Sequence, residues 1–418
     1  MDAVFYGGRV EGSVSPPPSK SHTHRAIILA ALSGGRCRID SPLLSFDTRA
    51  TMDAARALGA RVEEHDGYVT VESDGIHAPD REIDVLNSGT TMRLMTGICS
   101  LFDSETRLTG DESIRRRPMK PLLDSLEACG ATCTSNDGKA PITVKGPLTG
   151  DGFSIDGSVS SQFVSSLIMT SAMTGHPMDV EIAGKLVSRP YIDITLSIMR
   201  RFGADAAFDG RVCHVEPTGY TPCDYRVPAD FSSAAFPLVA GGIGGRITAE
   251  GLDLSDAQGD SRIIEVLKEI GCDVSEGPGG VTCARTGNLR GAEIDVGDIP
   301  DLFPVIAVLL STAKGRSRLY GAPHLRFKES DRIDLTEKML RNLGGNIEGT
   351  DDGCVIEGVP GLRGGRIVHN GDHRIFMAGA VASLVADGPV SMENDGCWNV
   401  SYPGFPEQMA AVGMKMKL

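Results

Sequence analysis

Basic side chains recur where the sequence predicts that helices begin. Seven carry this pattern: Lys20, Arg25, Arg93, Arg117, Lys328, Arg332 and Arg374. Free N–H groups at a helix N-terminus attract anions, and a cation beside them strengthens the attraction. The chain as a whole is acidic, with a formal net charge of −14, so a gathering of cations is informative. These residues predict a site for two or more anionic groups of small molecules.

Two clusters early in the chain combine cations with hydroxyl groups. In residues 16–25, Lys20 and Ser21 follow three prolines at a predicted helix start. In residues 87–93, Gly89 would let an anion approach the backbone closely, beside Arg93. A simpler explanation of both clusters is a helix cap with solvated basic side chains. The first cluster lacks the glycine spacing of a nucleotide-binding loop.

Three consecutive arginines, residues 115–117, lie in the segment 110–119. They suggest a clamp for a carboxylate or a phosphate. A solvated charge run explains Arg115 and Arg116 equally well. It explains Arg117 less well, because Arg117 precedes Pro118 at a helix start.

Neutral donors form two further clusters, residues 158–162 and 188–191. Their serines are by themselves most simply explained as helix caps. Donors of this kind can also orient a polyhydroxylated ligand. The candidates are Ser160, Ser161, Gln162, Ser188 and Tyr191.

Carboxylates suited to proton transfer lie in the C-terminal half. Asp301 begins an apolar helix, and Glu329 lies within the charged segment 324–332. Lys328 and Arg332 are four residues apart, so on one helix they would share a face and could bind one anion. A surface ion pair between Lys328 and Asp331 is the simpler explanation for that part of the segment.

A sixfold repeat must position these clusters. A Gly that follows Leu, Cys, Phe, Ile or Val closes a predicted helix at residues 59, 130, 203, 271, 344 and 413, at intervals of about 70 residues. Glycine there can take the left-handed position that ends a helix. First helices are predicted to start near Lys20, Ser88, Ser160, Asp230, Asp301 and Asp372. Second helices are predicted to start near Asp47, Arg117, Arg189, Asp260, Lys328 and Pro403.

Six such repeats are too many for one compact core, so we expect two lobes of three repeats each. The break is predicted near Val227-Pro228. Lobe one would contain residues 1–12 and 228–418, and lobe two residues 13–227, although the N-terminal strand could belong to either. A cleft between two similar lobes is a natural place for a ligand.

Composition excludes several functional classes. The net charge of −14 argues against binding of nucleic acids. No apolar stretch resembles a signal peptide or a membrane span, so we expect a cytoplasmic protein without a membrane partner. The ten cysteines form no CxxC pair, and we expect most of them to be reduced and buried. No metal or nucleotide motif is present, and we expect a monomer.

Seven phrases together resemble the 5-enolpyruvylshikimate-3-phosphate (EPSP) synthase family over almost the full chain. They are PSKSHTHR (18–25), LNSGTTMR (86–93), GDESIRRRPM (110–119), DGSVSSQF (156–163), LVSRPYID (186–193), HLRFKESDRI (324–333) and DHRIFM (372–377). The resemblance implies an α/β fold, a two-lobed inside-out α/β barrel of six βαβαββ-type units, three per lobe. It also implies transfer of the enolpyruvyl group from phosphoenolpyruvate to the 5-hydroxyl of 3-phosphoshikimate, without a cofactor.

The resemblance also implies a role for each matching residue. Asp301 would accept the hydroxyl proton, and Glu329 with Lys20 would handle the proton at the methylene carbon. Positions that match 3-phosphoshikimate binding are Lys20, Ser21, Arg25, Ser160, Ser161, Gln162, Ser188, Tyr191, Asp301, His324 and Lys328. Positions that match phosphoenolpyruvate binding are Lys20, Gly89, Arg93, Arg117, Gln162, Arg332 and Arg374.

Two positions depart from the pattern of many relatives. Val400 stands where many relatives have Lys, and His324 stands where they often have Asn. One contact to phosphoenolpyruvate is therefore expected to be missing, which bears on affinity for this substrate and for inhibitors that mimic it.

Three other classes have related features. The enolpyruvyl transferase family that acts on UDP-N-acetylglucosamine is the alternative, but its typical Cys is absent from residues 111–117. RNA 3′-phosphate cyclases would need a basic face for RNA. A ring-forming scaffold protein would not require Lys20, Asp301 and Glu329 at helix starts.

Overall fold

The computed structural model describes residues 2–418, which divide into two compact units. Unit 1 runs up to Pro17 and continues with Ala229–Leu418, and unit 2 is Pro18–Pro228. The lobe boundary predicted at residue 12 lies inside strand β2 (Val10–Val14). That strand pairs in parallel with β15 (Gly245–Ala249), so it belongs to unit 1 along its whole length.

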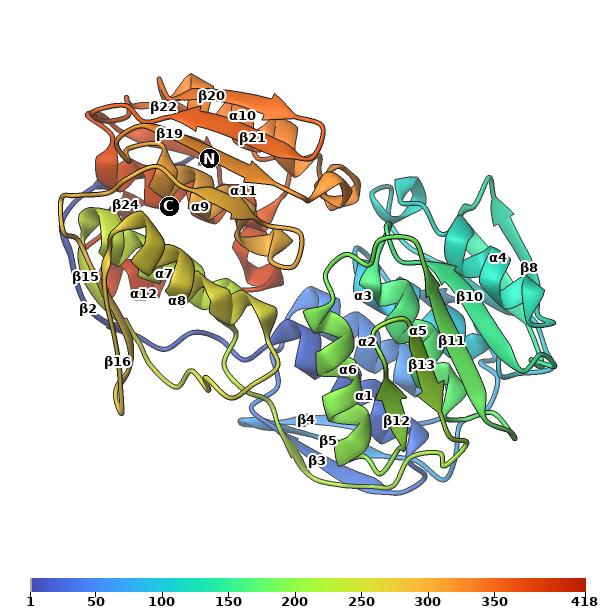
Figure 1. Ribbon diagram of the computed structural model, residues 1–418. Coiled ribbons are helices and arrows are strands. Elements are labelled where there is room, and N and C mark those ends of the chain that lie inside the picture. Colours follow the sequence, from blue (N-terminus) through green and yellow to red (C-terminus); the bar gives the residue numbers. More distant parts are fainter. Residues whose placement is uncertain (1) are drawn as a thin grey trace. The chain divides into compact units, whose positions relative to one another are not determined.

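Unit 2 contains three four-stranded mixed sheets (Figure 1). The first has the order β14 (Tyr225–Arg226), β3 (Arg36–Asp40), β5 (Tyr68–Glu72), β4 (Arg61–His65). The second has the order β6 (Ile83–Asp84), β7 (Thr106–Thr109), β9 (Lys139–Lys145), β8 (Thr132–Asn136). The third has the order β10 (Gly152–Asp156), β11 (Met178–Ala183), β13 (Val212–Val215), β12 (Ala206–Phe208).

Unit 1 also contains three four-stranded sheets. The order in the first is β16 (Asp273–Gly277), β17 (Gly280–Ala284), β15, β2. The second has the order β18 (Glu293–Asp295), β19 (Arg316–Tyr320), β21 (Gly353–Glu357), β20 (Asn346–Thr350). The third has the order β22 (Gly365–Arg366), β23 (Val390–Glu393), β1 (Asp2–Gly7), β24 (Lys415–Lys417).

All six sheets share one pairing pattern, a parallel pair followed by two antiparallel pairs. In the second sheet of unit 1, β18 runs parallel to β19, and β21 is antiparallel to both β19 and β20. Distant strands complete three of the sheets. Strand β14 adds to the first sheet of unit 2, while β2 and β1 add to sheets of unit 1.

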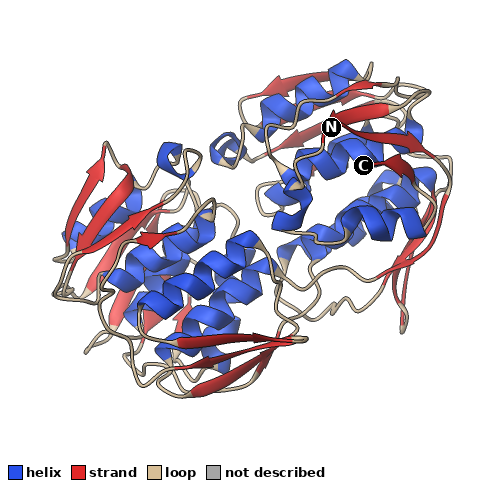
Figure 2. Ribbon diagram, turned by 180° about the vertical axis from the view of Figure 1, so that it is seen from behind, coloured by secondary structure: helices blue, strands red, loops and turns tan. Residues whose placement is uncertain are grey.

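Three helices in each unit are buried on nearly every side. These helices are α1 (Lys20–Leu32), α3 (Gly89–Cys99), α5 (Ser161–Ser171), α7 (Phe231–Gly244), α9 (Phe303–Leu310) and α11 (His373–Ala382). In each unit they lie inside, with the strands towards the outside (Figure 2). All six begin at or within two residues of their predicted starts, so the predicted positions of the first helices are confirmed.

The second helix of each repeat has one buried face. These helices are α2 (Phe46–Ala57), α4 (Lys120–Ala128), α6 (Pro190–Arg201), α8 (Ile263–Ile270), α10 (Arg332–Asn342) and α12 (Phe405–Ala411). Short 3-10 turns complete the inventory: η1 (Ile114–Arg116), η2 (Gly259–Arg262), η3 (Pro300–Leu302), η4 (Pro323–Phe327), η5 (Ser383–Val385) and η6 (Cys397–Val400).

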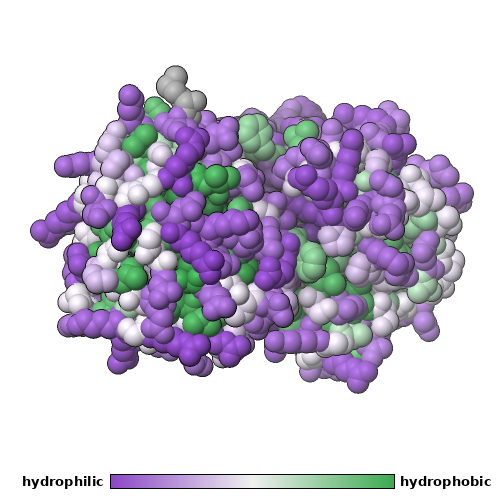
Figure 3. Space-filling view, turned by 90° about the horizontal axis from the view of Figure 1, so that it is seen from above, coloured by the Kyte–Doolittle hydropathy of each residue, from purple (hydrophilic) through white to green (hydrophobic). Residues whose placement is uncertain are grey.

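Other broad features follow from these elements. Within residues 2–418, no helix has both the length and the apolar character needed to cross a membrane. The face seen from above in Figure 3 is mostly hydrophilic, in keeping with the charged composition. All ten cysteines are free thiols, and eight of them are buried, as expected from their spacing.

The glycine that ends each second helix adopts left-handed backbone geometry, as predicted. Its φ angle is +97° at Gly59 and +103° at Gly271, and it is also positive at residues 130, 203, 344 and 413. Residues with a Cβ atom avoid this region because the Cβ approaches the carbonyl oxygen. The sixfold Gly phrase is therefore explained by the way the helices end.

Replacing Gly271 by alanine tests this explanation. A Cβ there would also lie 3.0 Å from the Asn288 carbonyl oxygen. We expect Gly271→Ala to lower the free energy of unfolding by about 1–2 kcal/mol, measured by urea denaturation. The control is Gly277→Ala in the same unit, where an added Cβ meets nothing within 4 Å. Equal stability of the two variants would contradict the explanation.

Candidate functional site

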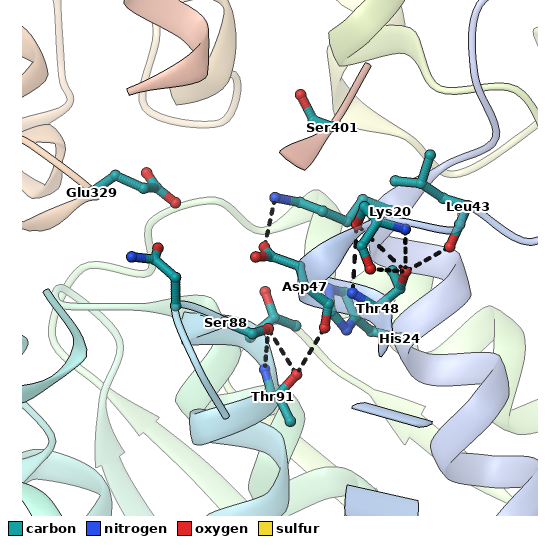
Figure 4. Close-up of polar contacts among 12 residues, drawn as sticks. Lys20, His24, Leu43, Asp47, Thr48, Ser88, Thr91, Glu329 and Ser401 are labelled. Atoms are coloured by element: carbon teal, nitrogen blue, oxygen red, sulfur yellow. Dashed lines mark hydrogen bonds and ion pairs between the residues drawn. The ribbon is translucent and has the colours of Figure 1, made fainter. Parts of the chain in front are cut away.

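Lys20 forms a shielded ion pair at the start of α1 in unit 2. Its Nζ lies 3.0 Å from Asp47 Oδ2, and the two side chains are 16% and 8% exposed. Asp47 is positioned at the first turn of α2, where its backbone carbonyl also accepts a hydrogen bond from Thr91 Oγ1 (Figure 4). The pair holds the Lys20 ammonium group at the N-terminus of α1. A bound anion could replace Asp47 as the partner of this ammonium group.

Arg25 is buried among neutral partners. Its Nε donates to Thr195 Oγ1 at 2.7 Å, and NH2 donates to Ser165 Oγ at 3.1 Å and to the Tyr191 carbonyl at 3.3 Å. NH1 donates to the Ser21 carbonyl. Burial lowers the pKa of Arg25 to about 10, against the raising effect of nearby tyrosines. A buried cation with neutral partners is electrostatically prepared for an anionic ligand.

Gln162 joins two helices of unit 2 that carry predicted site residues. Its Oε1 accepts from Arg93 NH1 at 2.7 Å, and its Nε2 donates to Thr90 Oγ1 at 2.9 Å. Gln162 follows Ser161 in α5, and Arg93 lies in α3. The amide therefore fixes the direction of the Arg93 guanidinium.

Gly89 and Arg117 are neighbours, although 28 residues separate them in the sequence. A Cβ added at Gly89 would collide with Arg117 NH1. Arg117 is 7% exposed, and its NH2 donates to Ser113 Oγ at 3.3 Å. Ser88 caps α3 by accepting from the Thr91 backbone N–H (Figure 4). The structure thus brings an arginine against the N-terminus of α3, as an anion site requires.

The predicted serines lie at helix starts. Ser160 caps α5 by accepting from the Gln162 backbone N–H at 3.3 Å. The simpler explanation of Ser160 as a helix cap is therefore confirmed. Ser161 and Ser188 are both 4% exposed. Ser188 has a positive φ of 55°, which is uncommon for a residue other than glycine and is often found at functional sites.

Unit 1 holds a buried network of charged side chains around Arg332. Arg332 is 1% exposed, and its guanidinium contacts three carboxylates: Asp301 at 2.7 Å, Glu329 at 2.6 Å and Asp372 at 3.0 Å. Arg374 NH2 contacts the second oxygen of Asp301 at 2.7 Å. Asp301 therefore lies between two guanidinium groups.

These cations determine the ionisation of Asp301, a direction that the sequence left open. Burial raises the pKa of Asp301, but Arg374, Arg332 and Lys328 together outweigh burial and hold this pKa below its ordinary value. Asp372, which caps α11 through the Arg374 backbone N–H, has a lowered pKa because Arg332 outweighs its burial. Both groups are carboxylates at neutral pH.

The prediction that Lys328 and Arg332 share a helix face is wrong. Helix α10 begins only at Arg332, with Asp331 as its cap, and Lys328 lies in extended backbone after η4. Asp331, the acid in the simpler explanation of this segment, forms an ion pair with Arg326 at 2.7 Å. Lys328 nevertheless acts electrostatically on Asp301, and His324 is buried in η4.

One group of potential metal ligands occurs within residues 2–418, formed by His369, Asp395 and Cys397. The His369 ring nitrogens already have protein partners. Nδ1 accepts from the Gly371 backbone N–H at 3.1 Å, and Nε2 lies 3.0 Å from the Glu393 carbonyl oxygen. This hydrogen bonding accounts for the cluster without a metal.

Comparisons with known proteins identify the family of this chain. The family model described as EPSP synthase (3-phosphoshikimate 1-carboxyvinyltransferase) matches residues 5–409. The chain belongs to the EPSP synthase family. It is 44% identical to 3-phosphoshikimate 1-carboxyvinyltransferase of Methanocorpusculum labreanum, with 100% of both chains covered. It is 41% identical to that of Methanothermobacter thermautotrophicus, with 99% of both covered.

Solved structures extend the family likeness to the fold. EPSP synthase from Acinetobacter baumannii is 28% identical, and it aligns with a TM-score of 0.82 over 100% of this chain and 99% of that chain. A second structure of the enzyme from this organism aligns with a TM-score of 0.81. The α/β fold with several mixed sheets is therefore shared with the EPSP synthase family.

Sequence reasoning missed two acids of this EPSP synthase family member. Asp47 binds Lys20, and Asp372 binds Arg332. Both stand at predicted helix starts, which was the available signal. An anion site is indicated by its cations, and the acids that neutralise those cations in the free protein carry no further signal of their own in the sequence. Val400 lies at the end of η6 and supplies no cation.

Proposed function

We propose that this chain transfers the enolpyruvyl group of phosphoenolpyruvate to the 5-hydroxyl of 3-phosphoshikimate, giving 5-enolpyruvylshikimate 3-phosphate and phosphate. Membership of the EPSP synthase family supports this reaction. Its strongest structural support is Asp301, a buried carboxylate held between Arg332 and Arg374. A base between two anion-binding groups suits a reaction between two anionic substrates.

We assign the residues of unit 2 mainly to 3-phosphoshikimate. Arg25 and Lys20 would supply charge for its anionic groups, and the serines would donate to its hydroxyl and phosphate oxygens. The group comprises Lys20, Ser21, Arg25, Ser160, Ser161, Gln162, Ser188 and Tyr191, with Asp301, His324 and Lys328 added from unit 1. Phosphoenolpyruvate would bind Lys20, Gly89, Arg93, Arg117, Gln162, Arg332 and Arg374.

Substrate binding would prepare Asp301 for its role as the base. In the free protein, Arg374 and Arg332 hold its pKa too low for efficient removal of a hydroxyl proton. An anion that binds these guanidinium groups offsets their positive charge, so the pKa of Asp301 rises. Asp301 then becomes a useful base only when phosphoenolpyruvate is present.

The chemistry would pass through a tetrahedral adduct. The 5-hydroxyl oxygen attacks C2 of phosphoenolpyruvate and gives its proton to Asp301, while C3 gains a proton from Lys20 or Glu329. Loss of a proton from C3 and of phosphate from C2 then forms the enol ether. Arginine and lysine side chains would stabilise the charge on the departing phosphate.

Phosphate release is the test of this function. Purified protein should release phosphate only when 3-phosphoshikimate and phosphoenolpyruvate are both supplied. UDP-N-acetylglucosamine in place of 3-phosphoshikimate is the control for the alternative transferase. Release with that substrate, and none with 3-phosphoshikimate, would refute the proposal.

Four finer expectations belong to the same proposal. The recurring sheet pattern, with helices inside and strands outside in each unit, supports an inside-out α/β barrel of six βαβαββ-type repeats. We further propose that the enzyme works as a monomer in the cytoplasm. It would need no cofactor, because the reaction needs only proton transfers and stabilised charge.

A further inference from the structure

Asp260 is a buried acid with no role in the reaction described above. It lies in η2, directly before α8, and only 6% of it is exposed. This is the predicted start of a second helix. The corresponding positions of the second and third repeats carry cations, Arg117 and Arg189. An acid at this place in the fourth repeat calls for a physical explanation.

The charges around Asp260 oppose its ionisation. Two of the charged groups that act on it are acids, Asp301 in η3 and Asp230 at the cap of α7. The third is Arg374 in α11, the one of these three charged groups that favours the carboxylate. Arg262 of its own element donates NH1 to the Asp295 carbonyl oxygen at 2.8 Å.

The hydrogen bonds around Asp260 also favour a neutral acid. Its Oδ1 is buried and has no hydrogen-bond partner. A hydrogen bond from Ser232 would lower the pKa of Asp260, but the Ser232 hydroxyl hydrogen is donated to Asp230 Oδ1 at 2.9 Å. A hydroxyl has one hydrogen, so Ser232 can only accept from Asp260 while this bond persists. A protonated Asp260 supplies the missing donor.

Arg374 links Asp260 to the anion site. NH2 of Arg374 is bound to Asp301, whereas Nε and NH1 are buried without partners. Unpaired buried donors on a guanidinium are prepared for an anion. Burial and Asp301 already raise the pKa of Asp260 to about 7 against the attraction of Arg374. An anion on Arg374 offsets this attraction and would be repelled by an ionised Asp260.

We propose that Asp260 takes up one proton from solvent when phosphoenolpyruvate binds Arg374, and that its neutral form is needed for tight binding. Asp260 is thus a positioning residue that acts through Arg374. The inference rests on the proposed function, in which Arg374 binds phosphoenolpyruvate. Binding of phosphoenolpyruvate then weakens as pH rises, because one proton must be taken up from solvent for each anion that binds.

Steady-state kinetics of Asp260→Asn test the inference. In the wild-type enzyme, KM for phosphoenolpyruvate should rise between about pH 7 and pH 9, by up to about tenfold per pH unit. Asparagine copies the neutral acid and can donate to Ser232. Its KM should therefore stay within about threefold over the same range, which is within 0.7 kcal/mol or so. The control is Asp273→Asn, an exposed acid of unit 1, which should follow the wild type.

A wild-type pH profile in Asp260→Asn would overturn the inference while leaving the proposed function intact. Failure of the wild type to release phosphate would refute the proposed function instead. In that case thermal unfolding still tests Asp260. A raised folded-state pKa makes stability fall as pH rises from about 4 to about 7, and Asp260→Asn should lack this fall. Parallel unfolding temperatures, or a variant that does not fold, would overturn the inference.

Discussion

Replacing Asp301 by alanine should abolish turnover while 3-phosphoshikimate still binds within about tenfold, or roughly 1.4 kcal/mol, of the wild type. Asp301 is the proposed acceptor of the hydroxyl proton. Loss of a positioned base typically lowers rates by about 10²–10⁴-fold. Phosphate release and calorimetric titration with 3-phosphoshikimate measure the two effects separately.

A second variant separates chemistry from folding. Alanine at residue 301 leaves Arg332 and Arg374 without a shared carboxylate, whereas Asp301→Asn keeps the shape and one oxygen acceptor. Asp301→Asn should fold and bind 3-phosphoshikimate but lose turnover to a similar degree. The control is Asp298→Asn, an exposed neighbour in the same loop, which should keep turnover. Near-normal turnover in either Asp301 variant would refute its assignment as the base.

Replacing Arg332 by methionine should lower the free energy of unfolding by about 3–5 kcal/mol. Arg332 is buried and forms ion pairs with three carboxylates, Asp301, Glu329 and Asp372. Its removal leaves their charges uncompensated in a shielded place. Urea denaturation at neutral pH measures the loss. Lys338→Ala in the same helix is the control, because its pair with Asp334 is exposed and such pairs contribute about 0–1 kcal/mol.

The loss in Arg332→Met should depend on pH. In the wild type, the pKa values of Asp301 and Asp372 are lowered, so their ionised forms stabilise the fold above the unfolded-state pKa of about 4. That stabilisation disappears as pH falls through the folded-state values. Without Arg332 these acids can be protonated more easily. The difference between variant and wild type should therefore be largest near neutral pH and smaller near about pH 4. A difference independent of pH would contradict this explanation.

Local patterns predicted much of the fold because they act over a few residues. The glycine at the end of each second helix and the polar residue at each helix start depend on nearby backbone geometry. Pairing between distant strands has no such local signal. Nothing in the short segment Tyr225–Arg226 indicates that it pairs with Ile39 and Asp40.

The candidate site was predictable in its residue types but not in its partners. Helix starts pointed to Arg332, Arg374 and Asp301, which the structure joins in one network. The helix face predicted for Lys328 was wrong because charge spacing alone does not indicate where a helix begins. Asp331 caps α10 and moves its start beyond Lys328. The direction of the Asp301 pKa needed the positions of both guanidinium groups, which only the three-dimensional structure supplies.

Strand β1 has a consequence for the order in which the chain can fold during synthesis. It lies between β23 and β24 and pairs Val4 with Lys417, so the third sheet of unit 1 needs both ends of the chain. Unit 2 has all its strands once Pro228 has been made. We expect unit 2 to fold on the ribosome while β1 stays unpaired until β23 and β24 have been made. A stalled chain that ends shortly after residue 300 should therefore contain a protease-resistant unit 2 and a digestible N-terminal strand.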